Sequence, residues 1–400
     1  MKEKNEVLEK EIKIGIVSPV SIKYLQDFLN LPSTSPYLSL GLGATAVNTI
    51  ILGLLRQGHK VSVYTLDPQV KETLVLKGEL LTIYIGHYRK GNAFQRASNF
   101  FKPEIDQVKH FILQDKPDIV NAHWSYEFAI AAIQSNIPHL ITFRDEAWEI
   151  LKHHRDIYRV FRFLMDRWVR WNGKNFSANS PYLAEKLKSL NNLTMIPNPI
   201  DDKYIVAQGK ILSKPIKIVT ILTGWIERKN PKNALLAFKK LREKYKEGVE
   251  LYMYGQGFGK GKQAEQWATE NQCTEGVHFI GAVPHTDLMK EISNYHILLH
   301  PALEESFGNT LLEGMARGLP IVAGKESGAV PWVVNYGKNG VLVDVKNIND
   351  IAKGIEQLIG DATLYQNLSK DGLDYVKENF SSNSIAQKYY ELYKEILSKS

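Results

Sequence analysis

The chain has 400 residues, 44% of them apolar, and a formal net charge of +7. This length and this apolar fraction are enough for two domains, each with its own hydrophobic core. The longest apolar run, about residues 50–55, is far shorter than a membrane span, and the single cysteine, Cys273, excludes an internal disulfide and a cysteine metal cluster. The charged segment 1–13 holds no hydrophobic signal core, so we expect a cytoplasmic protein rather than an exported one.

The first half of the chain alternates apolar strands with helices, as a doubly wound parallel sheet does. An amphipathic helix is predicted over 44–56, closed by Gly58, and the sequence 196–201, Ile-Pro-Asn-Pro-Ile-Asp, interrupts the alternation. Strands are predicted at 13–17, 61–64, 81–85, 119–122, 139–142 and 176–178.

A basic amphipathic helix is predicted between the strands at 139–142 and 176–178. Residues 152–174 hold seven Lys or Arg and two Asp. In helical projection one narrow face carries Arg155, Arg159, Arg162 and Arg170, and the opposite face carries Ile157, Val160, Phe161, Leu164, Trp168 and Trp171. Such a helix can lie on an anionic membrane. For a cytoplasmic protein, that membrane would be the inner face of the plasma membrane. We favour the alternative, in which the apolar face packs on the sheet and the arginines meet solvent or a ligand's phosphates.

The alternation restarts after Pro215, which predicts a second Rossmann-like domain joined to the first near residues 197–215. Strands are expected at 216–222, 249–254, 277–280, 296–299, 321–323 and 340–343. No internal repeat or low-complexity tract is present.

The most informative segment is 300–324, where Glu305 and Glu313 stand on either side of a glycine-bearing turn that opens a helix. A helix amino terminus after a strand is an anion site, because its first N–H groups are unpaired and the helix dipole favours negative charge. Glu313 lies in an apolar stretch and therefore needs a partner or a ligand. An anion site beside carboxylates fits a ligand that is both a phosphate ester and a polyol, such as a sugar nucleotide.

This segment resembles the signature of the family 4 glycosyltransferases, retaining enzymes of the GT-B fold that share the frame P-x-x-x-E-x-F-G…E-x-M-A-x-G-x-P. Every position of the frame is present, as Pro301, Glu305, Phe307, Gly308, Glu313, Met315, Ala316, Gly318 and Pro320. The resemblance implies an α/β protein of two Rossmann-like domains facing a central cleft. Residues 1–197 would form an acceptor-binding domain onto which the helix at 382–400 packs, and 198–381 a nucleotide-sugar donor-binding domain.

The resemblance also implies roles for single residues. Glu313 would accept hydrogen bonds from the ribose, and Glu305 would hold the donor sugar. The diphosphate would meet Arg228, Lys229 and the backbone of Ser306, Phe307, Gly308, Asn309 and Thr310. Gly255 matches a strand-end glycine of the donor site, and Val283 lies in the segment whose backbone reads the base. No metal and no cofactor are implied.

In the first domain, His123 follows a predicted strand in a context, Pro-Asp…Asn-Ala-His, that resembles the family's sugar-contacting histidine. Two positions depart from the family pattern. Trp225 stands where an arginine is usual, so Arg228 would take its place, and Arg144 stands where a histidine is usual.

The sequence Gly41-Leu-Gly43-Ala-Thr-Ala46 has three open interpretations. It matches a loose dinucleotide fingerprint, with Asp67 at the end of the second strand, although it lies more than twenty residues after the first strand. Alternatively Gly43 belongs to a loop over the donor diphosphate, or the glycines only allow close packing.

Taken together, the sequence predicts a retaining hexosyltransferase that moves a hexosyl unit from a nucleotide-diphospho-sugar to a hydroxyl of a glycan or lipid-linked acceptor, in the synthesis of cell-surface polysaccharide. Catalysis would rest on His123 and Glu305. The alternatives are a GT-B sugar-nucleotide epimerase, an NAD-dependent oxidoreductase, and a non-enzymatic membrane or nucleic-acid binding module. We expect no nucleic-acid partner.

Overall fold

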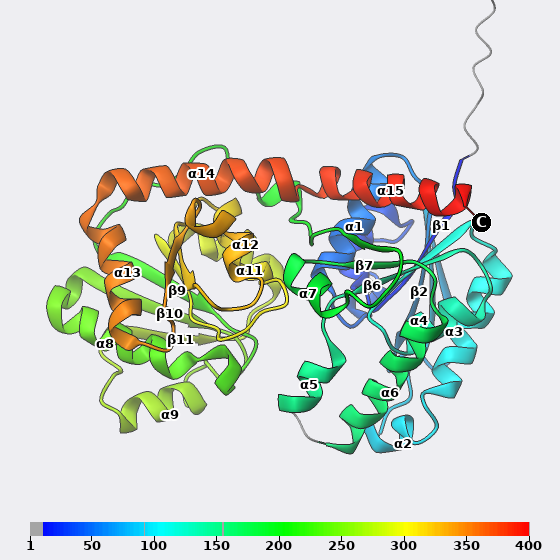
Figure 1. Ribbon diagram of the computed structural model, residues 1–400, viewed down its shortest axis with the longest axis horizontal. Helices are drawn as coiled ribbons and strands as arrows, with labels where there is room; N and C mark the ends of the chain where they lie inside the picture. The colour runs from blue at the N-terminus through cyan, green and yellow to red at the C-terminus, as the bar shows by residue number, and fades with distance from the viewer. Residues whose placement is uncertain (1–10, 92, 154–155, 400) are drawn as a thin grey trace, which may run out of the picture. The chain divides into compact units, whose positions relative to one another are not determined.

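The computed structural model describes residues 11–91, 93–153 and 156–399, and its internal contacts divide the chain into two units (Figure 1). The first unit runs to Asn179, resumes over 183–197 and takes in the chain from Ser382 onward. The second unit holds 180–182 and Asn198–Ser381. Each unit is built around one sheet.

The first unit contains an eight-stranded sheet in the order β3-β4-β2-β1-β5-β6-β7-β8. Neighbouring strands are parallel, except that β3 runs antiparallel to β4. The central strands are buried along their whole length, as expected for a parallel sheet covered on both faces. The strands are β1 (Ile14–Val17), β2 (Val61–Asp67), β3 (Leu74–Lys77), β4 (Leu81–His87), β5 (Ile119–His123), β6 (His139–Phe143), β7 (Phe176–Ala178) and β8 (Leu193–Met195).

Two hydrophobic clusters lie on the two faces of this sheet. One joins the sheet to helices α1 and α15, and the other joins it to α3, α4 and α6. The α-helices of this unit are α1 (Thr45–Arg56), α2 (Ala93–Ala97), α3 (Lys102–Asp115), α4 (Glu127–Gln134), α5 (Ala147–His153), α6 (Ile157–Asn172) and α15 (Ser382–Ser398). Helix α7 (Pro181–Lys186) is divided, because its first two residues are assigned to the second unit. Two 3-10 helices, Ile22–Phe28 and Pro36–Ser39, separate β1 from α1.

The C-terminal helix α15 belongs to the core of the first unit although it is last in the chain. Gly53 of α1 lets the two helices approach closely, since a Cβ atom there would lie 2.5 Å from the carbonyl oxygen of Ser382. Tyr389 and Tyr393 are fully buried, and the Tyr393 hydroxyl accepts a hydrogen bond of 2.8 Å from Asn121 of β5. The last helix therefore completes the apolar face that α1 begins.

The second unit contains a six-stranded parallel sheet in the order β11-β10-β9-β12-β13-β14. Its strands are β9 (Ile216–Ile221), β10 (Val249–Tyr254), β11 (Val277–Gly281), β12 (Ile297–His300), β13 (Ile321–Gly324) and β14 (Val341–Val343). Helices α8 (Pro231–Tyr245), α9 (Gln263–Glu270) and α13 (Ile348–Gly360) share one core cluster, and α10 (His285–Glu291), α11 (Asn309–Ala316), α12 (Val330–Val333) and α14 (Ala362–Phe380) share the other. Short 3-10 helices lie at Asp202–Tyr204, Glu227–Lys229, Lys246–Gly248, Ile292–Asn294 and Asn335–Gly337.

Every strand expected from periodicity is present, with bounds that differ by at most three residues. Two strands were not expected, β3 and β8. Both are short edge strands with exposed residues, so neither carries the continuous apolar run that identifies a buried strand. None of the helices in the described parts of the chain is long and apolar enough to cross a bilayer.

The basic segment differs from the favoured prediction. The predicted helix is present as α6, preceded by the short helix α5, and Arg155 lies outside the described residues. The prediction that its apolar face packs on the sheet holds only in part: Phe161 and Trp168 are partly buried against the sheet's core cluster, whereas Ile157 and Trp171 are 56% and 78% exposed. The side chains of Arg162 and Arg170 are instead 17% and 7% exposed and point into the protein.

Buried carboxylates explain this orientation. The Arg162 guanidinium pairs with Glu127 of α4 and lies 3.7 Å from the centre of the Tyr126 ring. Arg170 donates to Asp166 at 2.6 Å and to Glu146 at 2.7 Å. A buried carboxylate is costly unless it is paired, so these acids hold the arginine face of α6 inward.

Candidate active site

The carboxyl edge of the second sheet gathers most of the residues that the sequence singled out. Strands β9 and β12 are parallel neighbours, so the loops that follow them leave the sheet side by side. The first loop leads to Arg228 and Lys229, and the second leads through Glu305 to α11. In open α/β sheets, this edge is where ligands bind.

Glu305 lies at the centre of a buried charge cluster. Its Oε1 atom accepts a hydrogen bond of 2.5 Å from the Lys229 ammonium and lies 3.3 Å from Nε2 of His300, the last residue of β12. Burial by itself raises the pKa of Glu305, but His300 and the charge of Lys229 outweigh it and hold that pKa at about 2. Glu305 is therefore ionised at neutral pH, and its Oε2 atom has no partner among the described residues.

The amino terminus of α11 follows directly. Gly308 has φ +90°, a conformation that favours glycine, and no side chain caps the helix. The ring of Phe307 is buried against Trp332 and Phe380, so only its backbone is available to a ligand at this turn. An uncapped helix start offers its first N–H groups and the positive end of the helix dipole to an anion. Ser306, Asn309 and Thr310 belong to the same turn.

Glu313 points from the second turn of α11 toward a residue that sequence reasoning missed. Its side chain is 8% exposed, and its Oε1 atom lies 2.7 Å from Nε2 of His285, the first residue of α10. His285 in turn packs edge-on against the ring of Tyr204 at 5.9 Å. Oε2 of Glu313 has no partner in the described part of the chain, so one oxygen remains for a ligand.

Arg228 and Trp225 show how this loop departs from the family pattern. The Arg228 guanidinium donates to the carbonyl of Glu304 at 3.0 Å, which ties it to the loop that carries Glu305. Trp225 packs its ring against Phe258 and Trp267, with ring centres 5.7 and 5.9 Å away, so it is partly buried against the core of its unit. Arg228 and Lys229 supply the cationic charge of the loop.

Gly255 and Val283 lie beyond the ends of β10 and β11. A Cβ atom on Gly255 would lie 1.8 Å from the carbonyl oxygen of Leu222, and its φ is +126°, so only glycine fits there. This explains Gly255 by the close approach of two strand ends. Val283 is half-buried against the core cluster of α10, which leaves its backbone as the part that a ligand can read.

In the first unit, His123 ends β5 and is fully buried beside Arg144, which follows β6. An N–H of Arg144 donates to Nδ1 of His123 at 3.1 Å. Burial and then the charge of Arg144 lower the pKa of His123 well below its ordinary value, so the ring is neutral. Because Nδ1 accepts, the proton lies on Nε2, and this buried N–H has no partner among the described residues.

The glycine loop before α1 is held by Asp67. The backbone N–H of Gly41 donates to Oδ2 of Asp67 at 2.7 Å, and that of Gln69 donates to Oδ1 at 2.6 Å. Both carboxylate oxygens therefore bind backbone of their own unit, which argues against the use of Asp67 on the adenosine ribose of NAD. A Cβ atom on Gly43, with φ +96°, would meet nothing within 4 Å, so the space beside this residue is open.

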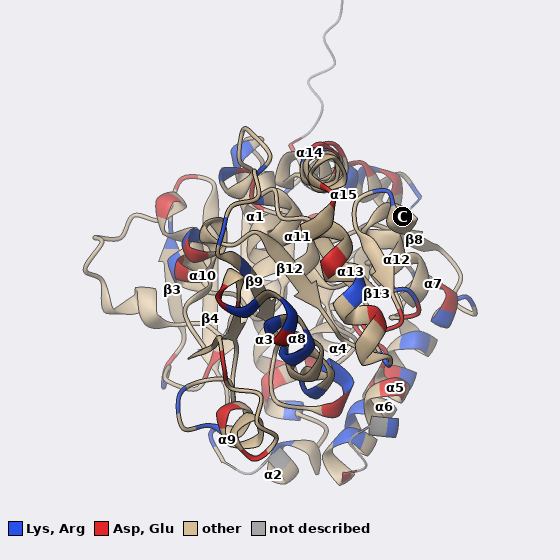
Figure 2. Ribbon diagram, turned by 90° about the vertical axis from the view of Figure 1, so that its left-hand side faces the viewer, with Lys and Arg blue, Asp and Glu red and all other residues tan. Residues whose placement is uncertain are grey.

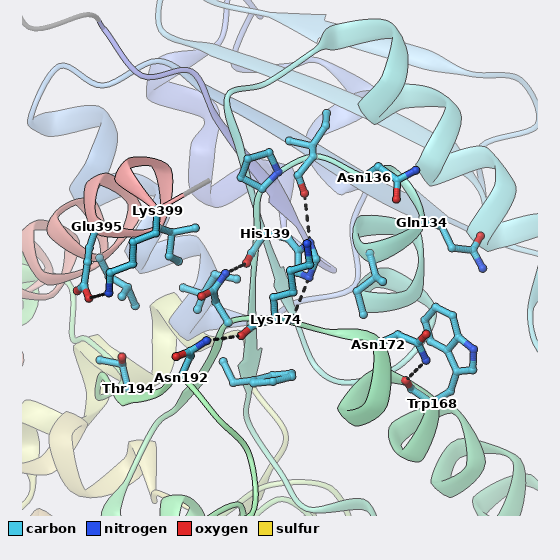
Figure 3. A pocket seen from close by; sticks show the side chains of 18 residues that line it. Gln134, Asn136, His139, Trp168, Asn172, Lys174, Asn192, Thr194, Glu395 and Lys399 are labelled. Atoms are coloured by element: carbon cyan, nitrogen blue, oxygen red, sulfur yellow. Dashed lines mark hydrogen bonds and ion pairs between the residues drawn. The ribbon is translucent and has the colours of Figure 1, made fainter.

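Gly43 and His123 thus lie at the carboxyl edge of the first sheet, and the other predicted site residues lie in the second unit. A cavity of about 920 Å³ lies at the opposite, amino edge of the first sheet (Figure 3). It holds His139, Lys174 and several amide side chains, and none of the predicted site residues lines it. Within the described ranges, no three or more His, Cys, Asp or Glu side chains are grouped so that they could hold a metal ion.

Two histidines, His285 and His300, were missed as site residues. The carboxylate that His300 contacts is five residues away in the sequence, and the one that His285 contacts is 28 residues away. The position of His300 at the end of an apolar strand was the available signal. For His285 the sequence offered no comparable signal.

Comparisons with known proteins identify the family that the chain resembles. Residues 208–374 match the family described as Glycosyl transferases group 1, and residues 43–204 match Glycosyltransferase Family 4. The chain is 24% identical to the lipopolysaccharide core biosynthesis glycosyltransferase LpsE of Rhizobium meliloti over 319 residues, which cover 76% of this chain and 85% of that protein.

Solved structures resemble the whole chain. Sucrose-phosphate synthase from Thermosynechococcus elongatus has a TM-score of 0.76 at 17% identity, covering 98% of this chain and 100% of that one. The Anabaena protein HepE in complex with UDP and glucose has a TM-score of 0.66 at 15% identity, covering 96% of this chain and 100% of that one. At these identities the likeness is one of fold, and it confirms the predicted GT-B class.

Proposed function

Because the chain belongs to the family 4 glycosyltransferases, we propose that it moves a hexosyl unit from a nucleotide-diphospho-sugar to a hydroxyl of a glycan or lipid-linked acceptor, with retention of the anomeric configuration. The observation that carries this proposal is the charge cluster of Lys229, His300 and Glu305 beside the uncapped start of α11. It joins an anion site to an ionised carboxylate, the pair of functions that a sugar diphosphate needs. LpsE, by its name, acts in lipopolysaccharide core synthesis, which supports a cell-surface glycan as the acceptor.

The donor would lie along the carboxyl edge of the second sheet. Oε2 of Glu305 would accept from sugar hydroxyls, and Oε2 of Glu313 from ribose hydroxyls. His285 orients the Glu313 carboxylate by holding Oε1 at 2.7 Å. Because the first turn of α11 lies between the two glutamates in the chain, a nucleotide sugar that reaches both would place its diphosphate at this turn.

The reaction would break the bond between C1 of the sugar and the phosphate oxygen and form a bond from C1 to the acceptor oxygen. The leaving diphosphate gains negative charge as the bond breaks, and the N–H groups of α11 with Arg228 and Lys229 would stabilise it. The acceptor proton passes to the leaving phosphate oxygen on the same face of the sugar, which accounts for retention without a protein nucleophile. This cationic loop supplies the charge that a metal ion would otherwise bring, and we propose that activity persists in excess EDTA.

His123 would act from the first unit. Its Nε2–H is buried and has no described partner, so it can donate to a sugar hydroxyl, and Arg144 fixes the tautomer that makes Nε2 the donor. A neutral imidazole is suitable here because C1 of the sugar gains positive charge as its bond to phosphate breaks. The positive charge of an imidazolium would repel that centre.

A donor screen tests the proposal. UDP-, GDP- and ADP-sugars are added one at a time, and the thermal midpoint is measured with the free diphosphates as controls. We begin with UDP-glucose, because HepE was solved with UDP and glucose. At least one donor should raise the midpoint in a concentration-dependent manner. If none does, the donor site is wrong.

Two variants test the division of roles. Glu313→Ala should weaken nucleotide diphosphate binding about tenfold, since it removes a charge-assisted hydrogen bond. Glu305→Ala should leave nucleotide affinity within about threefold and slow sugar transfer by about a hundredfold, because its partner is the sugar. Equal loss of nucleotide affinity in both variants would overturn the assignment. Sugar release or inversion from donor without acceptor, at the rate of transfer, would favour the epimerase.

A further inference from the structure

The helix α6 presents an apolar stripe to solvent. Ile157, Val160, Leu164 and Trp171 are 56%, 38%, 46% and 78% exposed. At 100° per residue these four side chains fall within about 60° of one another, so they form one line along the helix. Water-soluble surfaces carry single exposed apolar residues, but a continuous line of large ones indicates a binding surface.

The stripe cannot turn inward without breaking buried ion pairs. The opposite face of α6 carries Arg162, Asp166 and Arg170, whose side chains are 17%, 0% and 7% exposed and are paired with one another or with Glu127 and Glu146. The protein thus buries these charged side chains together with Met165 and Val169, and it leaves four large apolar side chains of α6 exposed. Ordinary surface helices do the reverse.

Neighbouring elements widen the apolar surface. Trp148 of α5, 46% exposed, lies against Phe163, and Phe100, 43% exposed, lies edge-on to Phe161 with ring centres 5.1 Å apart. A recess of about 450 Å³ between α3, α4 and α6 opens beside the stripe. The polar residues that line the recess include Lys102 and Asp106. Its apolar residues are Phe100, Ile105, Ile130, Leu164, Met165 and Trp168.

The exposed charges beside the stripe are mainly positive. Lys152, Arg167 and Lys174 are exposed, and Lys and Arg recur along α6 in Figure 2. Of the nearby acids, Asp156 caps α6 by accepting from the Arg159 N–H at 2.9 Å, and Glu149 is paired with Lys152 and Lys186. A second copy of this surface would bring cations against cations, whereas an anionic surface complements them.

We propose that α5 and α6 dock this protein on an anionic phospholipid bilayer. The stripe enters the boundary between headgroups and acyl chains, where Trp148 and Trp171 suit the interface, and Lys152, Arg167 and Lys174 meet the phosphates. The recess beside Leu164 has a mainly apolar lining and accepts part of an acyl chain. This inference stands on the exposed surface alone and does not depend on the transferase mechanism.

Vesicle co-sedimentation of the full chain tests the proposal. We use vesicles of phosphatidylcholine alone and of phosphatidylcholine with 30% phosphatidylglycerol, at low and high salt. We expect partition to the anionic vesicles at least tenfold above that to the neutral ones, and weaker partition at high salt. The double substitution Leu164→Glu with Trp171→Glu should lower it at least tenfold. The matched control is Ile211→Glu, because Ile211 is 76% exposed in the second unit.

Three results would overturn the inference. The wild-type chain could fail to bind anionic vesicles, the double variant could bind as well as Ile211→Glu, or sedimentation velocity could show that the stripe joins two copies and is closed to lipid. Circular dichroism and thermal midpoints verify that both variants fold. Transfer to a water-soluble acceptor should be unchanged in the double variant, so loss of vesicle binding with intact transfer separates this inference from the proposed function.

Discussion

Replacing Lys229 with methionine tests the charge cluster at Glu305 most directly. Lys229 Nζ and Glu305 Oε1 are 2.5 Å apart, and the two side chains are only 7% and 12% exposed. Removing one member of a buried ion pair costs about 3–5 kcal/mol, because the remaining charge loses its compensation. We therefore expect Lys229→Met to lower the free energy of unfolding at pH 7 by that amount.

The pKa of Glu305 gives a second route to the magnitude. Folding lowers this pKa from 4.5 to about 2. At about 1.4 kcal/mol per unit, the ionised carboxylate contributes roughly 3 kcal/mol of stability at neutral pH. Because the folded pKa is the lower one, the unfolded chain takes up the proton first. The contribution is thus complete above pH 4.5 and is lost as the pH falls toward 2, and Lys229→Met should flatten part of this dependence.

Urea unfolding of the wild type, Lys229→Met, Glu305→Gln and the double variant, at pH 7 and pH 4, measures both effects. The coupling energy of the cycle should exceed about 1.5 kcal/mol for two groups in contact. Lys188→Met is the control, since Lys188 and Glu185 are 74% and 70% exposed, and it should leave the midpoint unchanged. Equal effects of Lys229→Met and Lys188→Met, or a coupling energy near zero, would refute the reasoning.

Three further outcomes follow from the geometry. Gly255→Ala should lower the free energy of unfolding by more than about 3 kcal/mol, and Gly224→Ala should lower it by about 1–2 kcal/mol. Both glycines have φ near +130°, but only at Gly255 would a Cβ atom lie against a carbonyl oxygen, and urea unfolding midpoints compare the two variants. Arg170→Met should cost about 3–5 kcal/mol in the same assay, because it leaves two buried carboxylates, whereas Arg167→Met, at an exposed position, should cost under about 0.5. The unfolded chain protonates His123 before the folded chain does, so stability should fall as the pH drops below 6.5, and His123→Asn should lessen that fall relative to wild type in pH-dependent unfolding curves.

Periodicity predicted the two parallel sheets because their central strands are buried on both faces and read as unbroken apolar runs. Periodicity did not predict which side chains of α6 are buried. Helical projection separated the arginine face from the apolar face, but Arg162 and Arg170 are buried and much of the apolar face is exposed. The acids that draw Arg162 and Arg170 inward include Glu127 and Glu146, which lie 35 and 24 residues away from their partners in the chain. A single-helix pattern carries no information about such partners.

The candidate site shows the same limit. The spacing of Glu305 and Glu313 indicated a donor site, because both glutamates lie in one continuous segment. The partner of Glu313, His285, lies 28 residues earlier, on a helix that approaches α11 only in the folded unit. The role of Trp225 was equally hidden, because its neighbours Phe258 and Trp267 come from other elements of the sheet's covering layer.

The position of α15 has a consequence for synthesis of the protein. The first unit takes Ile385, Tyr389 and Tyr393 into its core, although nearly two hundred residues separate Pro197 from Ser382. The ribosome therefore synthesises the whole second unit before α15 is available to cover the apolar face of the first unit. During that interval the face of α1 around Gly53 is uncovered, and a nascent chain in this state would depend on chaperones. Without residues 382–398, the apolar face of α1 would stay uncovered, and we expect the first unit to be destabilised.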